Sequence, residues 1–150
     1  MMLYECGVRF EKTMENGLTR KVTELYLVDA LSFAEAEGRI TKEMEPFISG
    51  DFDVVTIKRT NISEIVENAS DSADKWFKAK LMFITIDEKT FKEKKQAVHF
   101  IVRATDINNA HSVVVEHMKT SVMDYEISTL DETKIMDLFR YEPNTAADNG

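Results

Sequence analysis

The sequence predicts an α+β fold in which a strand–strand–helix–strand unit occurs twice, over residues 1–67 and 76–139. Apolar residues recur in the same order at an offset of 73 or 74 positions, which is the pattern of an internal repeat. Each copy begins with alternating apolar and polar residues, as strands with one solvated face do. Each copy also contains one helical segment with a recognisable N-cap. We interpret this pattern as a tandem duplication.

The repeat is clearest in two blocks. Residues 26–30 align with residues 100–104 at an offset of 74, and residues 60–65 align with residues 133–138 at an offset of 73. Few aligned residues are identical, but apolar residues coincide in both blocks. The two copies therefore share their expected buried positions.

In the first copy, local signals separate the elements. Asn16 and Gly17 form a dipeptide that suits a hairpin turn. Ser32 and Glu35 form a capping box at the start of a helix, and Pro46 lies near its end. The expected elements are strands over 4–10 and 20–30, a helix over 33–47 and a strand over 52–59.

The second copy repeats this order. Asp106 is the expected helix cap, and the helix is expected to bury a stripe of Ala110, Val113, Val114 and Met118. The expected strands cover 76–86, 94–104 and 124–130. Residues 68–75 have the composition of a linker, and residues 140–150 that of a flexible tail.

The pairing within the sheets follows from the hairpin that opens each copy. Hairpins are antiparallel, so we expect mainly antiparallel sheets. Three strands and one helix bury little surface alone. We therefore expect the two repeats to share one core, with two helices packed about a pseudo-twofold axis.

Composition limits the cellular setting. The single cysteine, Cys6, excludes an intrachain disulfide and a cysteine-based zinc site, and it suits a reducing cytosol. No apolar run approaches the roughly 20 residues of a membrane helix, and the first residues do not resemble a signal peptide. We expect a cytoplasmic protein without membrane contact. The net charge of −8 argues against general coating of nucleic acid.

Enzyme chemistry has little support in the sequence. Cys6 lies at an inward position of a strand, where a buried thiol is the ordinary interpretation. His111 and His117 are six residues apart, which places them on different faces of a helix. The chain has 5 glycines and no nucleotide-binding motif. We expect no catalytic residues, no metal site and no cofactor.

Three blocks carry a resemblance to a known family: residues 24–37, 52–59 and 134–139. The chain resembles the Bacteroidetes family known as domain of unknown function 4494 (DUF4494), from about Tyr4 to Phe139. The resemblance implies a gut-Bacteroidetes, phage or mobile-element setting. It implies no activity and assigns no functional residues.

Charge is distributed unevenly. Residues 75–95 contain seven lysines against three carboxylates, so this segment carries +4 and the rest of the chain carries −12. A basic hairpin with aromatic residues can follow phosphates and stack bases. Lysines on an edge hairpin also prevent sheet-to-sheet aggregation. The candidate contacts with nucleic acid or a partner are Trp76, Lys78, Lys80, Lys92, Lys94 and Lys95.

These observations favour a non-enzymatic binding or assembly module that acts through protein contacts, with a protein partner or as a homodimer. The separation of charge suits such pairing. One alternative is single-stranded nucleic-acid binding by the hairpin 75–95. Another is small-ligand or nucleotide binding in a cleft between the repeats.

Overall fold

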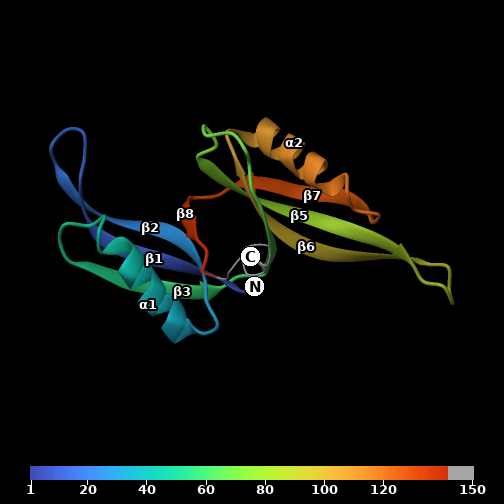
Figure 1. The fold of residues 1–150 in the computed structure, drawn as a ribbon, viewed down its shortest axis with the longest axis horizontal. Helices are drawn as coiled ribbons and strands as arrows, with labels where there is room; N and C mark the ends of the chain where they lie inside the picture. Colours follow the sequence, from blue (N-terminus) through green and yellow to red (C-terminus); the bar gives the residue numbers. More distant parts are fainter. Residues whose placement is uncertain (142–150) are drawn as a thin grey trace, which may run out of the picture. The chain divides into compact units, whose positions relative to one another are not determined.

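The computed structural model describes residues 1–141, and it divides into two compact units. Of the described residues, unit 1 comprises residues 1–60 and 134–141, and unit 2 comprises Asn61–Thr133. Of the predicted tail over 140–150, residues 142–150 lie outside the described part. Each unit contains one helix and a four-stranded sheet, so the predicted α+β class is confirmed (Figure 1).

Unit 1 has the sheet order β3-β1-β2-β8 and one helix, α1. Its elements are β1 (Leu3–Thr13), β2 (Thr19–Asp29), α1 (Phe33–Met44), β3 (Phe52–Arg59) and β8 (Ile135–Phe139). The three long strands pair antiparallel, whereas β8 pairs parallel to β2. The core contains one face of β1 and β2 and the buried stripe of α1, which comprises Ala36, Ile40 and Met44.

Unit 2 has the same arrangement, with the order β4-β6-β5-β7. Its elements are β4 (Ile62–Val66), β5 (Lys75–Ile86), β6 (Glu93–Ala104), α2 (Ile107–Met118) and β7 (Asp124–Glu132). The short strand β4 pairs parallel to β6, and the other pairings are antiparallel. Phe77, Leu81 and Phe100 pack under Ala110 and Val114 of α2.

The predicted helix starts are confirmed. The Ser32 hydroxyl accepts a hydrogen bond from the Glu35 amide at 3.1 Å, and the Asp106 carboxylate accepts one from the Asn109 amide at 2.8 Å. The first helix ends at Met44, three residues before the predicted end. Pro46 has no amide hydrogen with which to continue the helical pattern, so the expected extension to 47 was wrong.

The strands β4 and β8 were not predicted. Each directly follows a long edge strand in sequence but pairs in the sheet of the other unit: β4 follows β3 and joins unit 2, and β8 follows β7 and joins unit 1. Sequence repeat and compact unit therefore do not coincide. The first repeat contributes Val66 to the core of unit 2, and Phe139 of the second repeat is half-buried against the core of unit 1.

Equivalent threonines mark both points of exchange. The amide and hydroxyl of Thr60 donate to the Leu3 carbonyl at 3.0 and 2.9 Å. Those of Thr133 donate to the Trp76 carbonyl at 2.9 and 2.8 Å. Thr60 and Leu3 each lie 73 positions before their counterparts, so the same contact occurs at equivalent places. Duplication explains this correspondence and stays our hypothesis for its origin.

The exchange of strands predicts where a core substitution acts. Val66→Ala should cost about 2 kcal/mol, because two buried methyl groups are lost. We expect faster amide exchange in β5, β6 and α2 of unit 2, although Val66 belongs to the first repeat. Phe139→Ala should instead cause faster amide exchange in β1, β2 and α1 of unit 1, although Phe139 belongs to the second repeat. Hydrogen exchange with mass spectrometry measures both, and faster exchange in β1–β3 of the Val66 variant would contradict the assignment.

Candidate functional site

The β5–β6 hairpin is the longest projection of unit 2. The two strands pair from Lys75 with Ala104 to Ile86 with Glu93. The pairing of β5 with β7 ends at Ile84, and β4 reaches β6 only between His99 and Val102. Beyond these positions the hairpin continues as a two-stranded ribbon that ends in the turn 87–92 (Figure 1). Its tip is therefore available for contact from several sides.

Part of the positive charge of the hairpin is neutralised within unit 2. Lys94 lies 3.3 Å from the Asp87 carboxylate, and Lys95 lies 2.6 Å from the Glu126 carboxylate. The hydrogen bond and charge of Glu126 raise the pKa of Lys95. Among residues 1–141, no ion pair involves Lys78, Lys80 or Lys92. The six predicted contact residues therefore do not form one continuous basic surface.

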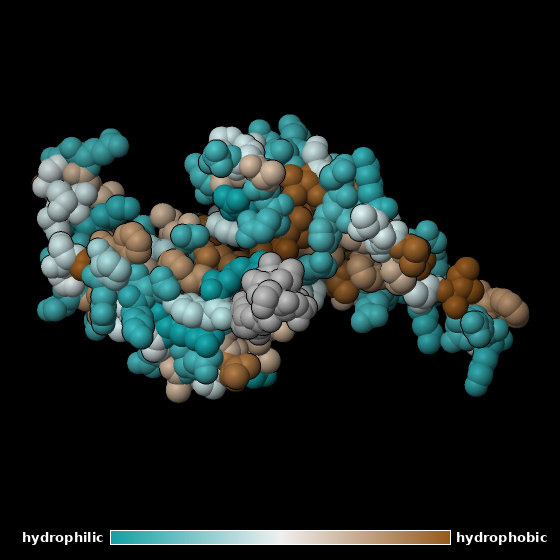
Figure 2. Space-filling model, viewed as in Figure 1, coloured by the Kyte–Doolittle hydropathy of each residue, from teal (hydrophilic) through white to brown (hydrophobic). Residues whose placement is uncertain are grey.

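Trp76 differs from the expected stacking residue. Its side chain is 5% exposed, and its carbonyl oxygen accepts the two bonds from Thr133. A base could not stack on this indole without movement of the sheet. The hairpin instead exposes Phe91 at 81% and Ile86 at 67%. Figure 2 shows apolar residues at the far end of this projection.

The turn that carries Phe91 is held by Asp87. One carboxylate oxygen of Asp87 accepts bonds from the amides of Lys89 and Thr90 at 2.8 and 3.1 Å. The Phe91 amide donates to the Asp87 carbonyl at 2.8 Å. The amide bonds to the carboxylate, with Lys94 beside it, lower the pKa of Asp87. The exposed ring of Phe91 thus projects from an ordered turn.

Phe91 has a φ of +57°, which places it in the left-handed region. A residue with a Cβ atom is held there at a cost of about 1–2 kcal/mol. In unit 1 the position 74 residues earlier is Gly17, with a φ of +81°. The first hairpin therefore uses the residue that suits this backbone, and the second carries an exposed aromatic residue instead. Comparison of the two copies could have revealed Phe91 from sequence.

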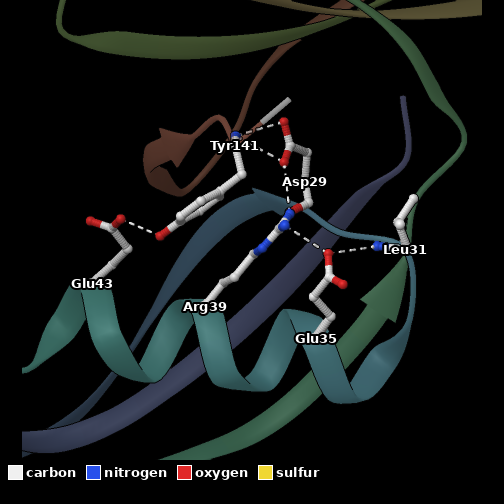
Figure 3. A network of polar contacts seen from close by, with 6 residues as sticks. All are labelled: Asp29, Leu31, Glu35, Arg39, Glu43 and Tyr141. Carbon is white, nitrogen blue, oxygen red and sulfur yellow. Dashed lines mark hydrogen bonds and ion pairs between the residues drawn. The ribbon is translucent and has the colours of Figure 1, made fainter. Parts of the chain in front are cut away.

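A second candidate is the polar cluster beside α1, shown in Figure 3. Asp29, at the end of β2, is fully buried. Its carboxylate accepts two bonds of 2.9 Å from the Tyr141 amide and one of 3.1 Å from Arg39. Arg39 also bonds Glu35 at 2.8 Å, and its guanidinium lies 4.5 Å from the centre of the Tyr141 ring. The Tyr141 hydroxyl donates to Glu43.

This cluster holds the chain after β8 against α1. Burial and the Glu43 carboxylate raise the pKa of the Tyr141 phenol, so its proton stays in place. Unit 2 has a counterpart at Arg103, 74 positions after Asp29. Arg103 donates to the Asn68 and Ala73 carbonyls at 2.7 and 3.2 Å, in the segment after β4. Both arrangements secure an exchanged strand, so we assign the cluster a structural role.

The structural role of Arg39 predicts a large effect on stability. Arg39→Met should lower the free energy of unfolding by about 3 kcal/mol, because the buried Asp29 carboxylate loses the Arg39 guanidinium that bonds it. Lys42→Met on the same helix is the control, since no ion pair involves Lys42 among residues 1–141 and we expect a change within about 0.5 kcal/mol. Urea denaturation measures both; equal effects would contradict the assignment.

The other side chains that could act as nucleophiles, bases or metal ligands are dispersed. Cys6 is buried, and this burial raises the pKa of its thiol to about 12. His117 bonds the Glu64 carboxylate at 2.8 Å and joins α2 to β4. Within residues 1–141, no group of three or more His, Cys, Asp or Glu side chains could hold a metal ion. No helix in this range is long and apolar enough to span a membrane. The cleft between the repeats stays a prediction.

The fold and site define the class of protein as an α+β chain of two units with one projecting basic and aromatic hairpin. The chain belongs to the family described as "Domain of unknown function (DUF4494)", whose model matches residues 2–141. The predicted family resemblance is therefore confirmed, while the Bacteroidetes setting stays a prediction. No curated protein and no solved structure matches the chain.

Proposed function

We propose that this chain is a binding module that acts through contacts with another protein, and that the β5–β6 tip makes the contact. One observation carries this proposal: Phe91 is 81% exposed in a left-handed conformation on an ordered turn. Unfavourable backbone conformations often accompany functional positions. Aromatic residues are also enriched among the side chains that dominate protein interfaces.

The surroundings of Phe91 suggest the chemistry of the partner surface. Ile86 extends the apolar tip, and Lys89 and Lys92 flank Phe91 in sequence. A matching surface would have an apolar socket bordered by carboxylates. A second copy of the chain has the required negative charge, because the residues outside 75–95 carry −12. Self-association is therefore the first interaction to measure.

Single-stranded nucleic acid has less support as the ligand. Lys94 and Lys95 are paired with carboxylates, and the indole of Trp76 is buried. Of the lysines predicted to contact nucleic acid, only Lys78, Lys80 and Lys92 have no ion pair among the described residues. Such binding needs aromatic side chains on which bases can stack, between basic groups. With Trp76 buried, Phe91 at the tip would have to provide this stacking surface alone.

We also infer a non-catalytic role and a cytoplasmic location. The single buried thiol suits a reducing compartment, and the dispersed histidines do not suggest acid–base chemistry. The phage or mobile-element setting rests on the family resemblance. Gene neighbourhood is the observation that would separate replication, capsid and defence settings.

Phe91→Gly separates folding from binding. The free energy of unfolding of the variant should be unchanged or higher by up to about 1 kcal/mol, because glycine suits the left-handed conformation. Binding should weaken at least roughly 10-fold, as for an aromatic residue central to an interface. Sedimentation velocity over a range of concentrations measures self-association. Comparative affinity purification from the source organism, followed by reconstitution with the purified partner, measures binding to another protein.

Leu18→Ala is the matched control. Leu18 is 64% exposed at the tip of the unit 1 hairpin, so its loss tests whether any exposed apolar tip matters. We expect this variant to bind as the unmodified chain does. The proposal fails if the Phe91 variant self-associates and captures partners as the unmodified chain does, or if no interaction is found in either assay.

A further inference from the structure

A basic cluster lies on the face of the unit 2 sheet that is opposite to α2. Phe77, Ala79 and Leu81 of β5 face the core, so the alternate residues Lys78 and Lys80 face the other side. His99 of β6 is the direct cross-strand partner of Lys80, and Lys78 pairs two residues further along β6. Neighbours of this kind bring three nitrogen-bearing side chains within mutual reach.

The cluster has few groups that offset its charge. Within residues 1–141, neither Lys78 nor Lys80 forms an ion pair, in contrast to Lys94 and Lys95 of the same hairpin. Asp131 of β7 is opposite Lys78 in the ladder, but no ion pair joins the two. Among the described residues, no carboxylate therefore neutralises either ammonium group.

His99 supplies a donor beside the two lysines. Burial, together with the charges of Lys78 and Lys80, lowers its pKa, so the ring is neutral at neutral pH. Its Nδ1 atom is buried without a hydrogen-bond partner. A buried lone pair is tolerated better than a buried N–H without a partner, which favours the proton on Nε2. Nε2 is not buried and has no partner within residues 1–141.

The fold does not require this cluster. The pair Lys80 and His99 corresponds to Gly7 and Leu25 in unit 1, and these two residues are cross-strand partners in the same register. Lys78 corresponds to Glu5. Unit 1 builds the same sheet with a glycine, a leucine and a carboxylate at these places. Strand pairing in this sheet therefore does not require basic residues at these places.

We propose that Lys78, Lys80 and His99 form a binding site for a phosphoryl group, as free phosphate or as the phosphate of a nucleotide. The lysines supply point charges, and the Nε2–H of His99 supplies a directed hydrogen bond. This site is separate from the Phe91 tip, and its existence does not depend on the protein-contact proposal.

Histidine NMR of the full chain tests the site. Titration with inorganic phosphate should shift the His99 imidazole signals to saturation, with His111 and His117 nearly unchanged. Titration with adenosine 5′-monophosphate identifies the source of the phosphoryl group. Equal affinity for both ligands indicates that the phosphate alone is recognised. Tighter binding of the nucleotide indicates a nucleotide ligand.

Two double variants with equal loss of charge distinguish a site from general attraction. Lys78→Gln with Lys80→Gln should weaken phosphate binding at least roughly 10-fold, since charge-assisted bonds are lost. Lys89→Gln with Lys92→Gln removes the same charge from the same hairpin and should change binding less than about 2-fold, because screening limits distant charges. His99→Gln, with both lysines retained, should also weaken binding.

Three results would overturn the proposal. One is a His99 signal that does not move with phosphate. Another is a linear shift of all three histidines, which is an ionic-strength effect. The last is equal loss of binding in the two double variants. Urea denaturation of every variant separates lost binding from lost folding, and the His99 variant tests the site independently if the lysine variant is unstable.

Discussion

The parallel pairing of two short strands is the constraint on which this structure depends. In sequence, β4 and β8 each follow a long edge strand, yet β4 completes the sheet of unit 2 and β8 that of unit 1. Residues from both repeats pack together in each unit: Val66 lies in the core of unit 2, and Phe139 packs against the core of unit 1. Neither repeat therefore contains all the strands of one unit, and the sheet of unit 1 is completed by residues near the end of the second repeat.

The two units secure their exchanged strands with opposite chemistry at one equivalent position. Asp29 is an acceptor and receives the Tyr141 amide, whereas Arg103 is a donor and reaches the Asn68 carbonyl. Each choice satisfies a backbone group in the segment that follows a short parallel strand. Both units thus have a hydrogen-bonding side chain at this position, but it is negatively charged in unit 1 and positively charged in unit 2. This explains why a buried carboxylate and an arginine occur at aligned positions.

The two units differ in side-chain chemistry at several aligned positions. The exposed Phe91 at the unit 2 hairpin tip aligns with Gly17 of unit 1, and the pair Lys80 and His99 aligns with the pair Gly7 and Leu25. In unit 1, Gly7 also accommodates the Thr56 hydroxyl, which would lie 2.3 Å from an added Cβ atom. Glycine thus suits the backbone at position 17 and the packing at position 7 of unit 1, whereas Phe91 of unit 2 is held in a left-handed conformation.

Much of the fold could be predicted from local patterns. Alternation located the long strands, and the caps at Ser32 and Asp106 located both helices, because these signals arise between near neighbours in the chain. Charge and composition likewise identified the basic hairpin. The partners of β4 and β8, the burial of Trp76 and the pairing of Lys94 and Lys95 with carboxylates were decided only by the tertiary structure. The pattern of a five-residue strand does not specify which strand it pairs with. Whether a given side chain is buried depends on contacts with residues distant in sequence.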